Sequence, residues 1–434
     1  MKQLKRKIFA FLVAACLICM NIVPAFADTT TDATAPAAAD VRQEAQLTAS
    51  YLMNNADYSN IADTSSFYNA SRNLLLSIRS GYDCSKQTEA YLSSVKTLVN
   101  KDGTLNISLA PYACPNDVLS SYAYLLMVLA VTGNDATDFN GCNIVAAFDN
   151  LLANITDSDL TYTYDWNTYS STGINPYHIG TFYSAVNSYK DSLTNADKAI
   201  AAVKKALTTL CAGGNGIDYS GTSADNNGIS LVPFASAYSD ADVKAAIDSA
   251  ITYVKTLADP DGSTQGQYWN EDYSKNWYAS NPNATALALA LFAQYNVSDY
   301  AATNYNALIK NFKSAVTPGC YTYQGYDSVY SAQDSMIGLV TYQYVLEGKA
   351  NPFDVSAEVK AIADAKNTPV EEPSTEPSTE PATEPYTGND VSPATGDVNV
   401  YMYLLLAAAC AATFTGVTVY NKKSALIIPG TYNL

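Results

Sequence analysis

Three segments of the chain combine aromatic rings with side-chain oxygens, a chemistry that stacks against a sugar and hydrogen-bonds to its hydroxyl groups. They cover residues 162–177, 268–278 and 321–330, and together they contain all three tryptophans of the protein. The residues that we predict to bind a ligand are Tyr164, Asp165, Trp166, Tyr177, Trp269, Asp272, Tyr273, Trp277, Tyr326 and Asp327. The pattern favours a glycan or another flat, partly apolar ligand.

The carboxylates in these segments bear on whether the chemistry is binding or catalysis. Glycosidases use two carboxyl groups that face each other across the substrate, roughly 5–10 Å apart. Asp165, Asp272 and Asp327 are the residues from which such a pair would come. A cavity mouth that held only rings and amides would instead indicate binding. Trp166 and Trp269 also fit a packing role between helices, because large buried rings usually serve packing.

The remaining inventory of reactive side chains is short. His178 is the single histidine, so zinc hydrolases and Ser-His-Asp enzymes are poor matches. Its position fits a core or rim histidine with satisfied hydrogen bonds. Asp117 and Asp334 fit helix caps or hydrogen-bond anchors better than acids. We expect no metal or other cofactor.

Cysteine spacing and charge narrow the class of protein further. The cysteines between the two ends of the chain stand singly, which predicts small buried thiols rather than a disulfide framework. They are Cys84, Cys114, Cys142, Cys211 and Cys320. The formal net charge of −17 at pH 7 argues against nucleic acid and anionic lipid as partners.

A repeating pair of helices must position these residues. Apolar helices are predicted to begin near Ser65, Asn116, Asn175, Asn226, Pro282 and Asp327, about 50 residues apart. Each follows an amphipathic helix, near 42–54, 86–100, 140–154, 195–211, 240–258 and 299–315. Inner helices that are apolar all round favour a closed ring over an open solenoid. The prediction is an all-α, closed (α/α)6 toroid of six helix pairs over residues 41–366, with almost no strand.

Four short stretches carry a resemblance to a known family. The sequence KTLVNKDG at 96–103 matches KTLADPDG at 255–262, and both resemble the end of a helix and the turn in the prenyltransferase/squalene-oxidase repeat. NPNATALALAL at 281–291 and YSAQDSMIGLV at 330–340 resemble the inner helices of that repeat. The resemblance covers roughly 45–355 and implies the α/α toroid of terpenoid cyclases and protein prenyltransferases. Its fold hosts many activities, so it implies no single function.

The catalytic motifs of that family do not match this chain. The cyclase motif DxDD would need a further aspartate at 157–160 or 259–262, where the chain reads DSDL and DPDG. No cysteine has an aspartate two residues before it, as the zinc site of prenyltransferases would require, and the thioester motif CGEQ is absent. A terpenoid cyclase-like enzyme is therefore the third alternative.

Both ends of the chain predict export and anchoring. Residues 1–27 read as a signal peptide that is cleaved after Ala25-Phe26-Ala27, and 28–40 as a disordered leader. A Pro/Glu/Ser/Thr-rich stalk at 367–391 precedes a motif at 392–397, a transmembrane segment at 398–421 and a cytoplasmic tail at 422–434. The motif contains Ser392, Pro393, Ala394, Thr395 and Gly396.

The motif at 392–397 resembles the LPxTG-type sorting signals of Gram-positive bacteria, with Ser392 in place of leucine. The resemblance implies that a sortase-type transpeptidase cuts after Thr395 and joins it to cell-wall peptide. A plain membrane anchor through the C-terminal helix is the alternative. Either way, the toroid is expected on the outer face of a Gram-positive cell.

Two classes of function remain for an aromatic, acidic mouth on such a protein. The first is a surface-displayed ligand-binding or adhesion module that recognises a glycan or flat organic ligand. The alternative is an extracellular carbohydrate-active enzyme, a glycosidase or lyase, on an (α/α)6 barrel. The presence or absence of two carboxylates facing each other in the cavity separates these classes.

Overall fold

The computed structural model describes residues 34–165, 167–168, 170–219, 221–268 and 277–367. The predicted signal peptide, sorting motif, transmembrane segment and cytoplasmic tail lie outside these residues, as do Trp166, Trp269, Asp272 and Tyr273. Among the described residues, no helix is long and apolar enough to cross a membrane.

Two sets of helices alternate along the chain, as the repeat predicts. The inner helices are α3 (Thr64–Arg79), α5 (Asp117–Val131), α8 (Ile179–Ser188), α10 (Ala224–Leu231), α12 (Pro282–Gln294) and α14 (Val329–Leu346). The outer helices are α2 (Ala38–Asn55), α4 (Ser85–Leu98), α6 (Ile144–Leu152), α9 (Ala196–Leu210), α11 (Ala241–Lys255) and α13 (Ser298–Ala307). Shorter helical pieces are α7 (Asp157–Leu160), η1 (Pro176–His178), η2 (Lys190–Ser192), η3 (Val232–Ala237) and η4 (Leu308–Phe312).

The inner helices are buried on all sides and the outer helices on one face, as their apolar patterns predict. The inner helix α5 is buried at nearly every position, because other helices cover it on all sides. The outer helix α9 buries Ala199, Val203, Ala206, Leu207 and Leu210, which share one face of the helix.

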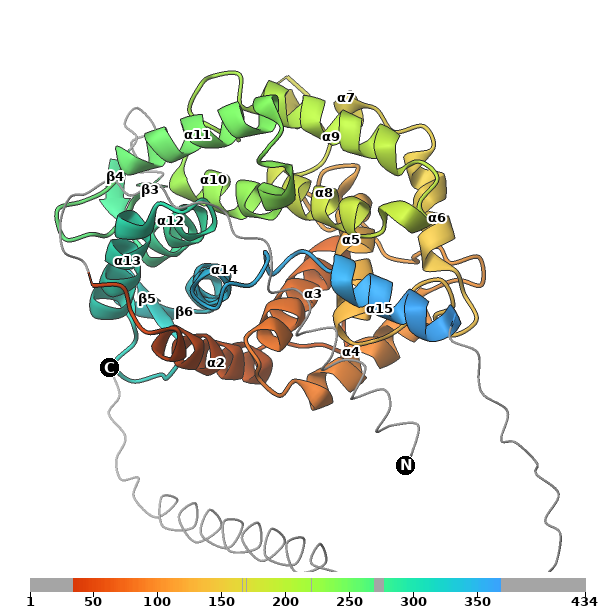
Figure 1. Ribbon diagram of the computed structural model, residues 1–434, viewed down its shortest axis with the longest axis horizontal. Coiled ribbons are helices and arrows are strands. Elements are labelled where there is room, and N and C mark those ends of the chain that lie inside the picture. The colour runs from red at the N-terminus through yellow and green to blue at the C-terminus, as the bar shows by residue number, and fades with distance from the viewer. Residues whose placement is uncertain (1–33, 166, 169, 220, 269–276, 368–434) are drawn as a thin grey trace, which may run out of the picture. The chain divides into compact units, whose positions relative to one another are not determined.

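The inner helices close into a ring, which confirms the toroid. Each packs against the next, from α3 through α5, α8, α10 and α12 to α14, and α14 packs back against α3 and α2. Figure 1 shows the outer helices α2, α4, α6, α9, α11 and α13 surrounding this inner set. The five cysteines are buried, as expected of small thiols in such a core.

Three antiparallel hairpins correct the expectation of almost no strand. They are β1 (Thr163–Asp165) with β2 (Ser170–Thr172), β3 (Gln265–Tyr268) with β4 (Trp277–Ser280), and β5 (Tyr321–Tyr323) with β6 (Tyr326–Ser328). Their tyrosine- and threonine-rich strands suit the extended backbone. The last hairpin turns through Gln324 and Gly325, both with positive φ (51° and 85°), the backbone that a two-residue hairpin turn needs.

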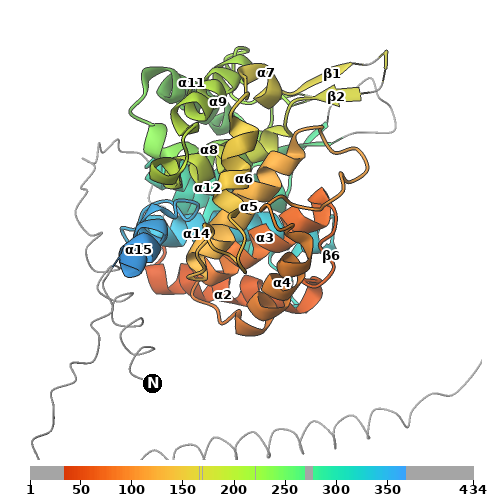
Figure 2. The ribbon, with the colours of Figure 1, turned by 90° about the vertical axis from the view of Figure 1, so that its right-hand side faces the viewer.

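One end of the ring is covered by a segment that the repeat does not predict. Residues 347–355, called the strap here, cross the C-terminal ends of the inner helices and lead into α15 (Ser356–Asn367), which packs on α5 and α8. Phe353 and Val355 of the strap are buried. In Figure 2, α15 lies on the left of the ring and β1, β2 and β6 lie on the right, so the strap and these hairpin strands occupy opposite ends. At the other end of the chain, α2 begins at Ala38, so the last part of the predicted leader 28–40 is helical.

Candidate functional site

Every inner helix, or the turn that begins it, contributes polar side chains to the interior of the ring. They are Tyr68 and Arg72 from α3, Tyr124 from α5, Tyr177 and His178 from η1, Asp225 and Asn226 from α10, Asn283 from α12, and Ser331 and Asp334 from α14. We call this set the polar interior. Ionisable groups are rarely enclosed in this way unless they are paired or functional.

Arg72 and Asp334 form the charged centre of the polar interior. Arg72 Nη1 lies 3.8 Å from Asp334 Oδ1 and donates a hydrogen bond of 2.7 Å to the Tyr68 hydroxyl. The guanidinium also lies 4.7 Å from the centre of the Tyr68 ring, a cation–π contact. Tyr68 and Arg72 are four residues apart on α3 and so share its inward face.

Asp334 has a second anchor on the neighbouring helix. Asn283 Nδ2 donates to Asp334 Oδ2 at 2.6 Å, and Ser331 Oγ donates to Asn283 Oδ1 at 2.8 Å. Burial raises the pKa of Asp334, while Arg72 and Asn283 act in the opposite direction. This fits the anchoring role expected of Asp334, but 19% of its side chain also remains accessible within the ring.

Asp225 is the second carboxyl group of the interior. Burial, followed by the negative charge of Asp334, raises the pKa of Asp225 to about 7. Asp225 lies in the first turn of α10, where the helix dipole would favour the charged form, so burial outweighs the dipole here. Its Oδ1 has no hydrogen-bond partner among the described residues. Asp225 is thus a carboxyl group that can stay protonated near neutral pH, and its enclosed Oδ1 has unused hydrogen-bonding capacity among the described residues.

His178 differs from the satisfied histidine that the sequence predicts. Its ring lies 4.3 Å from that of Tyr68, centre to centre, and 7% of the residue is exposed. Within the described part of the chain, its Nδ1 finds no partner. Burial and the charge of Arg72 lower the pKa of His178 to about 3, so the ring is neutral at physiological pH. A neutral imidazole offers one donor and one acceptor.

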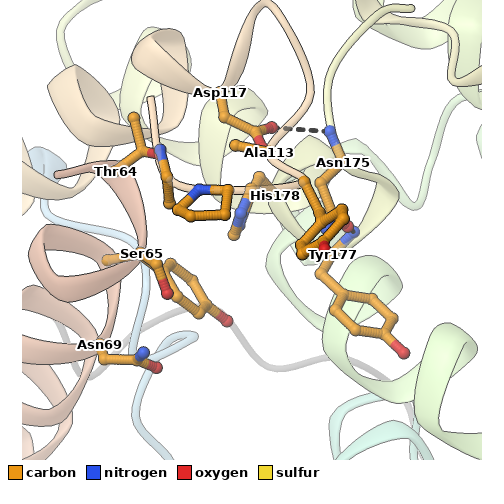
Figure 3. A pocket seen from close by; sticks show the side chains of 12 residues that line it. Thr64, Ser65, Asn69, Ala113, Asp117, Asn175, Tyr177 and His178 are labelled. Atoms are coloured by element: carbon orange, nitrogen blue, oxygen red, sulfur yellow. Dashed lines mark hydrogen bonds between the residues drawn. The ribbon is translucent and has the colours of Figure 1, made fainter. Parts of the chain in front are cut away.

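A pocket of about 220 Å³ opens beside this interior, at the N-terminal ends of α3, α5 and α8. Ser65 and Asn69 line it from α3, and Asn175, Tyr177 and His178 line it from the start of the third inner helix (Figure 3). We call it the side pocket. Its third wall is the loop 110–113, which includes Tyr112.

Hydrogen bonds hold the walls of the side pocket in place. Asp117 accepts from the backbone N–H groups of Cys114 and Asn175, both at 2.8 Å, and the bond to Asn175 is drawn in Figure 3. Asp117 is therefore an anchor between two repeats, as expected. Thr64 Oγ1 accepts from the N–H of Ala110 at 3.0 Å, which ties the loop to the start of α3.

The predicted ligand-binding residues fall into two groups. Tyr177 lines the side pocket, and its hydroxyl donates to Asn226 Oδ1 at 3.2 Å. Tyr164, Asp165, Tyr326 and Asp327 are exposed on hairpins β1–β2 and β5–β6. Trp277 is the first residue of β4, and its side chain lies outside the description, as do the placements of Trp166, Trp269, Asp272 and Tyr273.

The hairpin carboxylates sit in a different environment from the interior pair. Hydrogen bonds from Asn167 and Thr168 lower the pKa of Asp165, and one from Thr317 lowers the pKa of Asp327. Both carboxylates are exposed and engaged within or beside their own hairpins. The carboxyl pair inside the ring is instead Asp225 and Asp334, both half-buried.

Sequence reasoning missed Arg72 and Asp225, and treated Asp334 only as an anchor. One signal for Arg72 was present, since a lone arginine in the otherwise uncharged stretch 64–78 has to be paired where it is enclosed. No signal brought Arg72, Asp225 and Asp334 together, because they lie on three helices far apart in the chain. In the described ranges, no three His, Cys, Asp or Glu side chains are grouped so as to hold a metal ion.

Comparison with solved structures places this fold among known toroids. The chain is similar to a family 88 glycosyl hydrolase from Bacteroides vulgatus, with 9% identity over 71% of this chain and 100% of the other, and a TM-score of 0.50. It is similar to a family 105 glycoside hydrolase from C. acetobutylicum ATCC 824, with 11% identity over 70% and 99% of the two chains and a TM-score of 0.48.

A terpenoid enzyme is also among the solved structures that match the chain. The chain matches ent-copalyl diphosphate synthase from Streptomyces platensis with 14% identity over 65% of this chain and 50% of the other, and a TM-score of 0.43. No protein-family model matches the sequence, and no curated protein matches it. At 9% identity, the likeness to the family 88 hydrolase shows a shared fold and nothing about activity.

Proposed function

We propose that the protein is an extracellular glycoside hydrolase whose active site is the polar interior of the toroid. The observation that supports this most is the carboxyl pair of Asp225 and Asp334, which are close enough for the charge of one to raise the pKa of the other. Two carboxyl groups whose surroundings give them different roles are the requirement of glycoside hydrolysis. The family 88 glycosyl hydrolase of similar fold agrees with this reading at the level of fold alone.

In this mechanism Asp225 is the general acid. Its raised pKa keeps the carboxyl protonated near pH 7, so it can donate that proton to the glycosidic oxygen as the C–O bond breaks. The leaving sugar departs as the neutral alcohol, and positive charge develops on the ring that remains.

Asp334 is the carboxylate partner. Burial raises the pKa of Asp334, and Arg72 and Asn283 oppose this rise by favouring the charged form. As a carboxylate it either takes a proton from the attacking water or attacks the anomeric carbon itself. Arg72 and Asn283 act as positioning residues, since they hold Asp334 through one ion pair and one hydrogen bond.

The exposed rings at the mouth extend the site toward solvent. Tyr164, Tyr326 and Tyr330 are large exposed side chains on or beside the hairpins that precede inner helices. Rings in such positions stack on sugar units of a longer chain. We therefore propose that the substrate is an oligosaccharide or polysaccharide, held at the mouth and cleaved inside.

A turnover assay with Asp225→Asn tests this proposal. The chain would be screened for release of reducing ends from neutral and acidic polysaccharides, at pH values from 4 to 9. Activity should fall as the pH rises through about 7, where Asp225 loses its proton. Asp225→Asn should lower turnover by roughly 10²–10⁴-fold, and Asp242→Asn, an exposed position on α11, should leave it unchanged. Full activity of folded Asp225→Asn would refute the assignment.

A non-catalytic ligand-binding or adhesion module is the second candidate. The exposed Tyr164 and Tyr326 favour it, because binding to rings at the mouth needs no acid. This reading predicts glycan binding without turnover, and binding that depends on the hairpins but not on Asp225.

We propose further that the toroid is displayed on the surface of a Gram-positive cell. The sorting-type motif at 392–397, the apolar run at 398–421 and the stalk at 367–391 support this placement. Thr395→Ala should convert a wall-linked protein into one that detergent extracts. If detergent fully extracts the wild type from intact walls, the plain membrane anchor is the better account.

A further inference from the structure

The side pocket is a cavity separate from the carboxyl pair that the proposed hydrolysis uses. It lies between α3, the loop 110–113 and the start of η1, and neither Asp225 nor Asp334 lines it. Tyr68, Tyr177 and His178 connect the two, since they belong to both the side pocket and the polar interior. A molecule that filled the pocket would therefore contact three side chains of the polar interior.

Three polar groups in the pocket wall have unused hydrogen-bonding capacity. His178 is buried, and its Nδ1 has no partner among the described residues. The side chains of Ser65 and Asn69 likewise make no hydrogen bond to another described residue, and both lie beside the pocket in Figure 3. A hydroxyl, an amide and a neutral imidazole each both donate and accept, as a sugar hydroxyl does.

The wall of the pocket carries no positive charge. None of the twelve residues that line it is a lysine or an arginine. His178 is neutral, because burial and Arg72 lower its pKa to about 3. Both oxygens of Asp117 already accept backbone N–H groups.

The nearest cation, Arg72, is committed elsewhere. It contacts the Tyr68 ring, donates to the Tyr68 hydroxyl and pairs with Asp334. Its Nε has no partner among the described residues, but its side chain is only 5% accessible. A sugar carboxylate or sulfate in the side pocket would lose its water without gaining an opposite charge, which is costly.

Tyr112 adds a ring at the entrance. It is fully exposed and has a φ of 66°, a backbone conformation that a bulky residue seldom adopts without a reason. Together with Tyr68 and Tyr177 it gives the pocket three aromatic side chains. Rings alongside neutral donors and acceptors are a combination that suits an uncharged sugar.

We infer that the side pocket is a subsite for one uncharged sugar unit of the substrate, and that it discriminates against uronic acids and sulfated sugars. The inference rests on the proposed glycoside hydrolase function for its biological meaning. It concerns binding at the side pocket, so it can be tested without turnover.

The test measures binding by titration calorimetry to the full-length chain carrying Asp225→Asn. The neutral probes are cellotetraose, mannotetraose and tetra-N-acetylchitotetraose, and the acidic probe is tetragalacturonate. At least one neutral probe should bind ten times or more tightly than tetragalacturonate. Asn69→Ala and Ser65→Ala should each weaken that neutral probe about three- to tenfold, the usual range for one lost hydrogen bond.

A reversal variant sharpens the test. Asn69→Lys places a cation in the pocket wall, so it should weaken binding of the neutral probe and tighten binding of tetragalacturonate. Ser249→Ala, on the outer helix α11, is the matched control and should change neither. Circular dichroism would establish that each variant is folded.

Each outcome bears on the inference. The inference would be overturned if the unmodified pocket bound tetragalacturonate more tightly than the neutral probes, or if no neutral probe bound. It would also be overturned if neutral binding were unchanged by Ser65→Ala, Asn69→Ala and Asn69→Lys. Turnover is scored separately with the wild-type chain. A neutral preference without turnover would refute the hydrolase but keep the subsite, whereas turnover of acidic glycans alone would keep the hydrolase and refute the subsite.

Discussion

The two ends of the inner ring are built from the same helices but differ in how their polar side chains are hydrogen-bonded. At the end covered by the strap, Asn351 donates to Val232 O at 2.6 Å and to Gln294 Oε1 at 3.0 Å. Ser184 Oγ donates to Phe353 O at 2.8 Å. At the opposite end, His178 Nδ1 and the side chains of Ser65 and Asn69 have no such partner among the described residues.

Arg79 and Arg72 show the same contrast on a single helix. Arg79, at the end of α3, donates to Pro352 O at 3.0 Å and Asp354 O at 2.7 Å, and pairs with Glu358 at 2.5 Å. Arg72, two turns earlier, has a looser pair at 3.8 Å, and its Nε has no partner among the described residues. The bonds between Arg79 and the strap stabilise that end of the ring. Pairing there is not complete, since Ser77 Oγ and Gln343 Oε1 are buried without a partner among the described residues.

The largest expected effect on stability lies at the strap. Phe353→Ala removes a fully buried ring between the ends of the inner helices, and should lower the free energy of unfolding by about 3–5 kcal/mol. Urea denaturation at pH 7 measures it, with Val316→Ala, an exposed position, as the control. A loss equal to that of the control would mean that the strap does not stabilise the ring.

A change in the polar interior should act in the opposite direction. The folded-state pKa of Asp225 is raised to about 7. The stability that its protonated form contributes is therefore fully present below the unfolded-state pKa and is lost as the pH rises through 7. At pH 8 the wild type holds a buried charge that Asp225→Asn removes. Asp225→Asn should therefore be more stable than the wild type at pH 8, by on the order of 2 kcal/mol.

Thermal melts at pH 4 and pH 8 measure this effect. The gain should disappear at pH 4, where Asp225 of the wild type is protonated in the folded state. Equal melting temperatures for variant and wild type at pH 8 would show that Asp225 is not enclosed as described. The same variant should lose turnover, so stability and activity would change in opposite directions.

His178 should make the stability of the fold sensitive to acid. The folded-state pKa is lowered to about 3, so the unfolded chain takes up a proton below about 6.5 while the folded chain does not. Stability should therefore fall as pH drops from 6.5 toward 3. His178→Gln should make this fall shallower by roughly 1 kcal/mol per pH unit. If the free energy of unfolding fell equally with pH in the variant and the wild type, groups other than His178 would cause the acid sensitivity.

The smallest expected effect on stability lies on the hairpins. Tyr164 and Tyr326 are exposed, so Tyr164→Ala and Tyr326→Ala should change the free energy of unfolding by less than about 0.5 kcal/mol. If these rings stack on the substrate, each change should weaken oligosaccharide binding by roughly 1 kcal/mol. Normal binding by the double variant would confine recognition to the ring interior and the side pocket.

The helices could be predicted because their signals are local. The apolar helix α12 begins at Pro282, its predicted start, with Asn281 as its cap. The outer helix α11 follows the amphipathic pattern at 240–258 closely. The hairpins were missed because their strands are very short, and rings in a turn suit a loop as well as a strand.

The strap and α15 escaped prediction for a different reason. Their partners, such as Arg79 and Ser184, lie more than 160 residues earlier in the chain. A repeat pattern also gives no indication of what covers its last unit. The helix ends to which the strap hydrogen-bonds come together only when the ring has closed.

By itself, the sequence predicted the helical repeat, the closed toroid and the burial of the cysteines, because periodicity and composition are properties of neighbouring residues. Only the tertiary structure decided which acids lie inside. Asp165 and Asp225 are the same residue type, yet one is exposed with a lowered pKa and the other enclosed with a raised one. The difference comes from burial and from Asp334, which ring closure brings near Asp225 from a helix more than 100 residues later.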